Sequence, residues 1–330
     1  MTETNFSYTS LTPELQLDAL ASIGIYPESG LSALNSYENR VFSFTDENQS
    51  RCVVKFYRPQ RWTEAQLHEE QRFSLELSEQ GCDIAAPVII NGQSLFHFQG
   101  YTFALFHNLS ARSMELDNID ILYEAGRALG KMHRIGAQSS FQHREHLDLQ
   151  TMLTNPIKEL QKSRYIPDFI KPELFITLQS IEKEVSPLLS KYDFAEIRLH
   201  GDCHASNILI SNDLPFFVDF DDCKTGPAIQ DLWMLINGDM QEKQLQLSML
   251  LDGYQEEYQF NQQELSLIEP LRCMRMVNYV NWISNRWSDP AFPLNFPWFT
   301  TDQYWKELLQ LLQHQLAALK EAPISLQPGY

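Results

Sequence analysis

The sequence predicts an α+β protein with two unequal lobes, a small antiparallel sheet followed by a larger, mainly helical part. Short runs rich in β-branched and aromatic residues are concentrated between residues 41 and 107. Beyond them, residues 120–134 repeat apolar side chains at helical spacing, and most of the remaining chain has a helical pattern. The chain turns polar directly after Phe106, so we place the boundary there, with residues 1–106 in the first lobe and residues 107–330 in the second.

The composition is that of a globular protein with an acidic surface. Of 330 residues 43% are hydrophobic, and 43 acidic residues face 25 basic ones, with a mean hydropathy of −0.32. A nucleic-acid partner is disfavoured because phosphate binding needs a basic face. The five cysteines form no C-x-x-C pair, which argues against a zinc site or a disulfide framework. No signal peptide and no apolar run of about 18 residues is found, so we expect a cytoplasmic protein without a membrane contact, and a monomer.

The first lobe is predicted from local signals. Thr12 and Pro13 begin a short helix that Gly24 ends. Residues 41–44 and 52–57 form two strands joined by a polar loop, residues 63–79 form a helix, and residues 86–92 and 100–107 complete a sheet of about five strands.

Two stretches in the second lobe attach a polar cluster to an apolar run of strand length. They are Leu199–Ile210 and Phe216–Asp222. Carboxylates at the ends of buried strands are costly unless a cation or a proton-transfer reaction uses them. The spacing of Asp202, Asn207 and Asp219 lets one hairpin bring them to a common edge. We interpret them as one base and two oxygen ligands for a hard cation such as Mg²⁺.

The pattern H-G-D-x-x-x-x-N at residues 200–207, followed by F-F-V-D-F-D-D at 216–222, resembles the aminoglycoside phosphotransferase and choline kinase group of kinase-like folds. The segments 34–40, 53–59 and 226–234 are similar to the RdoA/YihE family, also called stress response kinase A, of bacterial serine/threonine protein kinases. The resemblance extends from about residue 10 to about residue 320. It implies a bilobal protein-kinase-like fold, with an ATP-binding first lobe and a catalytic second lobe.

The resemblance also implies roles for individual residues in a reaction of Mg²⁺ and ATP with serine or threonine hydroxyls of protein substrates. Asp202 would be the catalytic base, and Asp219, also catalytic, would hold Mg²⁺ with Asn207. Lys55 would hold the α- and β-phosphates and pair with Glu70, with Glu69 as the alternative. Ser36 would lie in the loop over the phosphates, although that loop has no glycine, and the hinge backbone at Phe106 and His107 would bind adenine.

Supporting residues carry further expectations. His200 supports the catalytic loop by hydrogen bonding, and Asp231 is expected as a buried N-cap that braces the same loop. Asp221 and Asp222 are each expected to cap the next turn rather than to assist the metal. Residues 284–300 are expected to form a long loop beside the substrate cleft.

Three alternatives stay open at this stage. A small-molecule kinase of the aminoglycoside or choline type would use the same catalytic residues. A metallophosphoesterase is suggested by the D-x-H at 202–204 and by Gly238-Asp239, but the further histidines of a two-metal site are missing. A non-catalytic ATP-binding scaffold is disfavoured because the base, the lysine and the metal ligands are all present.

Overall fold

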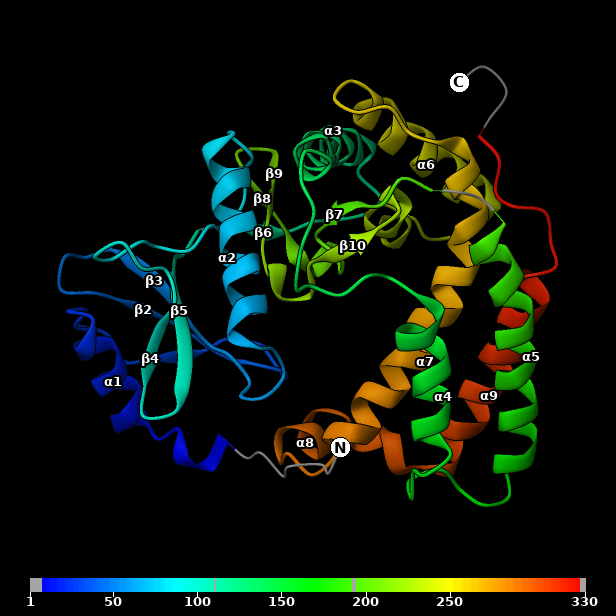
Figure 1. The fold of residues 1–330 in the computed structure, drawn as a ribbon, viewed down its shortest axis with the longest axis horizontal. Helices are drawn as coiled ribbons and strands as arrows, with labels where there is room; N and C mark the ends of the chain where they lie inside the picture. The colour runs from blue at the N-terminus through cyan, green and yellow to red at the C-terminus, as the bar shows by residue number, and fades with distance from the viewer. Residues whose placement is uncertain (1–7, 110, 192–193, 327–330) are drawn as a thin grey trace.

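The structure, a computed structural model, describes residues 8–109, 111–191 and 194–326. It has two lobes: in Figure 1 a small sheet lies on the left, a helical lobe lies on the right, and helix α2 stands between them. This arrangement confirms the predicted α+β fold with a small antiparallel sheet and a larger helical part. None of the helices in the described part of the chain combines the length and the apolar composition needed to cross a membrane.

The described residues of the small lobe form a five-stranded antiparallel sheet in the order β1-β2-β3-β5-β4. Its strands and the two helices of this lobe are α1 (Pro13–Ser22), β1 (Ser32–Ala33), β2 (Arg40–Thr45), β3 (Arg51–Phe56), α2 (Glu64–Glu79), β4 (Phe96–Phe98) and β5 (Tyr101–His107). Helix α1 begins as predicted from its cap, and α2 also begins with a side-chain cap. Thr12 accepts a hydrogen bond from Leu15 N, and Thr63 closes a capping box with Gln66.

The prediction of a strand over residues 86–92 is wrong. Only isolated bridges occur there, such as Pro87 with Phe106, and the edge strand is β4. Pro87 has no N–H to give to a ladder, and Asn91-Gly92 turns the chain with positive φ at both residues. The segment therefore crosses the sheet edge instead of extending it.

Helices dominate the large lobe. They are α3 (Ile119–Gly136), a π-helical turn (Gln150–Thr154) that continues into α4 (Asn155–Leu160), α5 (Lys171–Ser190), α6 (Met240–Gln255), α7 (Ile268–Arg286), α8 (Ala291–Asn295) and α9 (Asp302–Ala318). Helices α4, α5, α7 and α9 pack together at one end of the lobe, and α3 packs against α6 at the other (Figure 1). The long loop expected over residues 284–300 is instead mostly ordered as the end of α7, helix α8 and a 3₁₀ turn at Pro297–Thr300.

Glycines let α3 and α6 cross in backbone contact. A Cβ built on Gly126 would lie 1.9 Å from the Leu250 carbonyl oxygen, and one on Gly253 would lie 2.0 Å from that of Tyr123. Only glycine fits at such a distance. Helix α3 also contacts strands β7 and β9, so the close crossing connects α6 to the strands that flank the two catalytic stretches.

Two small sheets in the large lobe carry the catalytic stretches. Strands β6 (Arg112–Ser113), β8 (Ile208–Ser211) and β9 (Leu214–Phe217) form one, and β7 (Ile197–Leu199) pairs with β10 (Lys224–Gly226) in the other. The hairpin β8–β9 pairs Ile208 with Phe217, so the residues before β8 and after β9 emerge at the same end. That register places Asn207 and Asp219 next to each other, as the spacing predicted.

Candidate active site

A cavity of about 760 Å³ lies between the two lobes. It is lined by each of the predicted site residues: Ser36, Lys55, Glu70, Phe106, His107, Asp202, Asn207 and Asp219. Six separate segments supply them: the loop before β2, strand β3, helix α2, the end of β5 and the two catalytic stretches.

The loop that presents Asp202 is held by backbone contacts. Gly201 has a φ of +86°, and a Cβ there would lie 2.2 Å from the Asp222 carbonyl oxygen, so this position requires glycine. Asp231, fully buried, accepts hydrogen bonds from His200 N at 2.7 Å and Gly201 N at 2.8 Å. His200 Nε2 donates to Val218 O at 2.9 Å, and this bond links the two catalytic stretches.

The predicted bracing role of Asp231 is confirmed, but its predicted position as a helix N-cap is wrong. Asp231 is the last residue of a 3₁₀ turn (Ala228–Asp231), and its carboxylate bonds to the catalytic loop instead of to its own helix. His133 Nε2 lies 3.1 Å from the same carboxylate, and His133 Nδ1 lies 2.9 Å from the Tyr254 hydroxyl. A buried carboxylate with these partners keeps the loop in one conformation.

Asp202 itself projects into the cavity and is one-quarter exposed. Its carboxylate is paired with Arg275 of helix α7, and His204 Nε2 lies 3.4 Å from its other oxygen. Burial would raise the pKa of Asp202, but the hydrogen bond from His204 and the charge of Arg275 hold that pKa well below its usual range. Asp202 is therefore ionised, and able to accept a proton once the guanidinium moves aside.

Asn207 and Asp219 present oxygen atoms suited to a hard cation. The Asn207 amide nitrogen donates to Asp202 O at 3.0 Å, which orients its amide oxygen away from the loop. Asp219 has a φ of 63° and a ψ of 68°, a left-handed conformation that costs about 1–3 kcal/mol for a non-glycine residue. It turns a half-exposed carboxylate toward the cavity. One amide and one carboxylate oxygen fit a Mg²⁺ ion that takes its other ligands from phosphates and water.

Lys55 points into the cavity from strand β3 and is almost fully buried. Its ammonium group lies 2.8 Å from Asp219, 3.3 Å from Asp221 and 3.7 Å from Glu70. Burial would lower the pKa of Lys55, but these three carboxylates hold it well above its ordinary value. The group is thus a fixed positive charge at the centre of the cavity.

The structure distinguishes the two candidate glutamates of α2. Glu70 faces Lys55, and it accepts hydrogen bonds from Tyr57 Oη at 3.1 Å and from the fully buried Arg144 at 2.9 Å. Glu69 faces the opposite way and accepts three backbone N–H bonds, from Gln142 at 2.6 Å and from His143 and Arg144 at 2.8 Å. Burial would raise the pKa of Glu69, but these three hydrogen bonds hold that pKa below its usual value.

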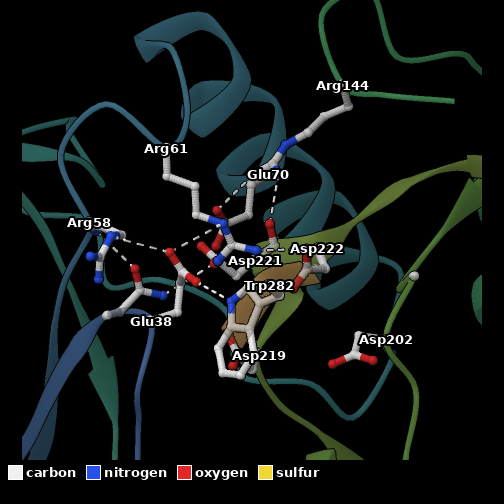
Figure 2. A network of polar contacts seen from close by, with 12 residues as sticks. Glu38, Arg58, Arg61, Glu70, Arg144, Asp202, Asp219, Asp221, Asp222 and Trp282 are labelled. Atoms are coloured by element: carbon white, nitrogen blue, oxygen red, sulfur yellow. Dashed lines mark hydrogen bonds and ion pairs between the residues drawn. The ribbon is translucent and has the colours of Figure 1, made fainter. Parts of the chain in front are cut away.

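Asp221 is not the turn cap that the sequence suggested. It is buried, pairs with Lys55 and Arg61, and accepts a hydrogen bond from Asn39 Nδ2 at 3.2 Å (Figure 2). Despite burial, these cations keep the pKa of Asp221 well below its usual range. Asp222 likewise binds Arg61, at 2.8 Å. Arg61 therefore joins the β3–α2 connection to the catalytic stretch of the large lobe.

Glu38 is the centre of a second group of contacts that joins the lobes. It accepts from Trp282 Nε1 of α7 and lies 3.6 Å from Arg58 and 3.9 Å from Arg61 (Figure 2). Arg286 Nε lies 2.5 Å from the same carboxylate group. These contacts place the glycine-free loop of residues 35–39 against the large lobe. Ser36, in the same loop, donates to Asn39 O at 3.3 Å.

Sequence reasoning missed several residues of the site. Arg144 and Arg275 lie in no motif, and Glu38, although it lies in segment 34–40, was given no role; the partners of all three are far away in the chain. One signal in the sequence pointed to these ion pairs: the two arginines of Arg58-Pro59-Gln60-Arg61, which directly follow the strand of Lys55. By contrast, Asp239 caps helix α6 by accepting from Gln241 N and Glu242 N, which removes it as a metal ligand of a phosphoesterase site.

Comparison with known proteins gives consistent findings. The profile of a family described as the phosphotransferase enzyme family matches residues 30–267. Stress response kinase A of Escherichia coli (strain K12) is 45% identical over 332 residues, with 100% of both chains covered. Serine/threonine protein kinase RdoA of Salmonella typhimurium is 44% identical over 330 residues, again with 100% of both chains covered.

Solved structures share the fold at low sequence identity. Amicoumacin kinase hAmiN, solved with AMP-PNP, Ca²⁺ and its ligand Ami, superposes with a TM-score of 0.73 and 18% identity, over 94% of each chain. Spectinomycin phosphotransferase, solved with ADP and spectinomycin, gives a TM-score of 0.64 and 14% identity, over 92% of this chain and 98% of that one.

Proposed function

The chain belongs to the phosphotransferase enzyme family and, within it, to the stress response kinase A group, and from this we propose that it transfers the γ-phosphoryl group of ATP to serine or threonine hydroxyls of proteins. The observation that carries the proposal is the convergence of Lys55, Asp202, Asn207 and Asp219 on one cavity between the lobes. The acceptor class is proposed from the names of the full-length relatives.

In this proposal the small lobe, residues 1–106, binds ATP and the large lobe, residues 107–330, supplies the catalytic groups. Adenine lies against the backbone at Phe106 and His107, and the phosphates extend below the loop of Ser36 toward Lys55. Glu70 and Asp221 hold the Lys55 ammonium in place, since both lie within 4 Å of it. Phosphoryl transfer depends on such positioning and charge neutralisation more than on covalent chemistry.

The reaction itself needs one proton acceptor from the chain. The acceptor hydroxyl oxygen forms a bond to the γ-phosphorus, the bond from that phosphorus to the oxygen bridging the β-phosphate breaks, and ADP leaves. The proton of the hydroxyl passes to the Asp202 carboxylate, which pairs with His204. The loop that carries Asp202 is held by the hydrogen bond from Gly201 N to Asp231. Mg²⁺, held by Asn207 and Asp219, would neutralise phosphate charge.

The test is a phosphorylation assay with γ-labelled ATP and Mg²⁺. The acceptors are dephosphorylated casein, an acidic protein, and histone, a basic one. We expect label on serine or threonine, and a loss of at least about a thousandfold in Asp202→Asn and Asp219→Asn. Asp213→Asn is the matched control because Asp213 is 91% exposed at the tip of the β8–β9 hairpin, and it should retain activity.

Each other outcome has a defined meaning. Full activity in either site variant would refute the assignment of the site. ATP turnover with phosphate transferred only to small alcohols, and to no protein, would replace the protein acceptor with a small molecule. Absence of nucleotide binding would refute the proposal as a whole.

A further inference from the structure

Helix α7 forms the wall of the cavity beside Asp202. Six of its residues line the cavity at helical spacing and so share one face: Leu271, Met274, Arg275, Asn278, Tyr279 and Trp282. The face carries one cation, one amide, one phenol and otherwise largely apolar side chains, and no carboxylate among these described residues. The contact between Arg275 and Asp202 shows that this wall adjoins the proposed base.

The acceptor has to approach Asp202 from this side. The opposite part of the cavity, around Lys55 and Glu70, is lined by the polar network of Figure 2, and Asp202 lies apart from that network. Because the γ-phosphoryl group would point from Lys55 toward Asp202, an attacking hydroxyl enters between Asp202 and α7.

Two cations flank Asp202 and pair with no other carboxylate among the described residues. Arg275 is 40% exposed, and within the described residues Asp202 is its one ion-pair partner. Lys224 lines the cavity, and its side chain passes next to Gly201, where a built Cβ would lie 2.9 Å from Lys224 Cε. No ion pair of Lys224 is found in the described part of the chain. Arg61 and Lys55, in contrast, are each bound by at least two carboxylates.

The other carboxylates that line the cavity already form ion pairs with cations of the chain. Glu38, Glu70, Asp221 and Asp222 each pair with a buried or half-buried cation, and Asp219 pairs with Lys55. Beside Asp202 a cationic acceptor would therefore meet Arg275 and Lys224, whereas an anionic acceptor would meet Lys224 and could displace Asp202 from Arg275. Two cations thus face one carboxylate around Asp202, although the whole chain carries a net charge of −18.

We propose that Arg275 and Lys224 select acceptors in which an aspartate or glutamate lies within three residues of the reacting serine or threonine. The acidic side chain takes over the Arg275 guanidinium, and this exchange frees the Asp202 oxygen to receive the hydroxyl proton. Binding of an acceptor with such an acidic residue thereby also frees Asp202 from Arg275. The inference rests on the proposed function, because it assumes Asp202 as base and a protein acceptor.

The experiment compares three peptides that differ only beside a central serine, with glutamates, glutamines or lysines on both sides. With wild-type enzyme at saturating Mg·ATP we expect kcat/KM to fall from the glutamate to the lysine peptide by at least about fivefold, the scale of one partly exposed ion pair. Arg275→Gln and Lys224→Gln should each raise KM for the glutamate peptide and leave KM for ATP unchanged. Arg275→Glu should reverse the preference.

Arg272→Gln is the matched control. Arg272 lies three residues earlier on the same helix, pairs with Glu269 at 3.2 Å and stacks on Trp233, so its loss should not change peptide preference. Thermal unfolding of every variant separates an altered preference from an unfolded protein. Retained preference in folded Arg275→Gln and Lys224→Gln would overturn the inference.

The remaining outcomes are distinguishable. A preference for the lysine peptide, or none, in an enzyme that still phosphorylates serine overturns the inference and leaves the proposed function standing. If Arg275→Gln and Lys224→Gln lower kcat/KM equally for all three peptides and raise KM for ATP, the two cations bind ATP phosphates, and this result also overturns the inference. Failure of wild-type enzyme to label any peptide or protein refutes the proposed function and, with it, this inference.

Discussion

Replacing Glu70 by glutamine should damage both ATP use and stability, whereas the same change at the adjacent Glu69 should damage stability alone. Glu70 lies 3.7 Å from the Lys55 ammonium and 2.9 Å from Arg144, and the side chains of all three are at most 7% exposed. Glutamine keeps the shape of the side chain and can still accept from Arg144, but it removes the negative charge from both pairs. Lys55 would then be held by Asp219 and Asp221 alone and shift toward them.

The magnitude follows from these contacts. Removing one partner of a buried ion pair costs about 3–5 kcal/mol, and we take about 3 kcal/mol because glutamine keeps a hydrogen bond. With an unfolding entropy of about 2.1 cal/mol/K per residue over this chain, that lowers Tm by about 4 °C. A displaced Lys55 should lower kcat/KM for ATP by about 10- to 100-fold, or about 1.4–2.7 kcal/mol of transition-state stabilisation.

Glu69→Gln is the control within the same helical turn. Its carboxylate accepts three backbone N–H bonds, and an amide nitrogen facing those donors leaves at least one unsatisfied, at a cost of about 1–3 kcal/mol. Because the folded enzyme stays in large excess, kcat/KM should change little. The assay is steady-state phosphorylation at varied ATP, with thermal unfolding in parallel. Glu70 would not be the partner of Lys55 if Glu70→Gln kept kcat/KM for ATP within about twofold of wild type. The same would follow if Glu69→Gln lowered kcat/KM for ATP more than Glu70→Gln did.

Two further predictions concern stability. Burial raises the pKa of Glu264 to about 7, so between about pH 4.5 and 7 the native state keeps a proton that the unfolded chain releases, and stability falls as pH rises through that window. Chemical unfolding at pH 5 and pH 8 should show a loss of about 3 kcal/mol that Glu264→Gln removes, and an unchanged pH dependence in the variant would contradict this. Gly126→Ala places a Cβ 1.9 Å from the Leu250 carbonyl oxygen and should cost about 3 kcal/mol or more, whereas Gly30→Ala, with nothing within 4 Å, should cost less than about 0.5 kcal/mol. Equal unfolding midpoints for those two variants would show that α3 and α6 separate without strain.

The sequence predicted the parts of the fold and the site that depend on near neighbours in the chain. The cap at Thr12 acts within three residues, and the hairpin that carries Asn207 and Asp219 is set by two short strands and a turn. The same reading failed at residues 86–92, where β-branched residues suggested a strand. There, Pro87 and the turn at Asn91 prevent a continuous ladder.

The tertiary structure alone decided which of two adjacent glutamates faces Lys55. Residues 69 and 70 are separated by about 100° on a helix, so local pattern gives both as candidates and only the packing of α2 selects one. It also decided that Asp221 is a buried ion-pair centre, because its partners Arg61 and Asn39 come from 160 and 182 residues away.

The sequence by itself thus determined the chemical groups of the site, since a base, an amide, a metal-binding carboxylate and a lysine are encoded as short motifs. Which charged side chains surround those groups depends on the tertiary structure. Arg275 reaches Asp202 from 73 residues away, and Arg40 binds Asp289 across 249 residues. Ion pairs depend on distance in space and on burial, neither of which a linear pattern contains, and so the feature from which we infer acceptor choice is visible only in the tertiary structure.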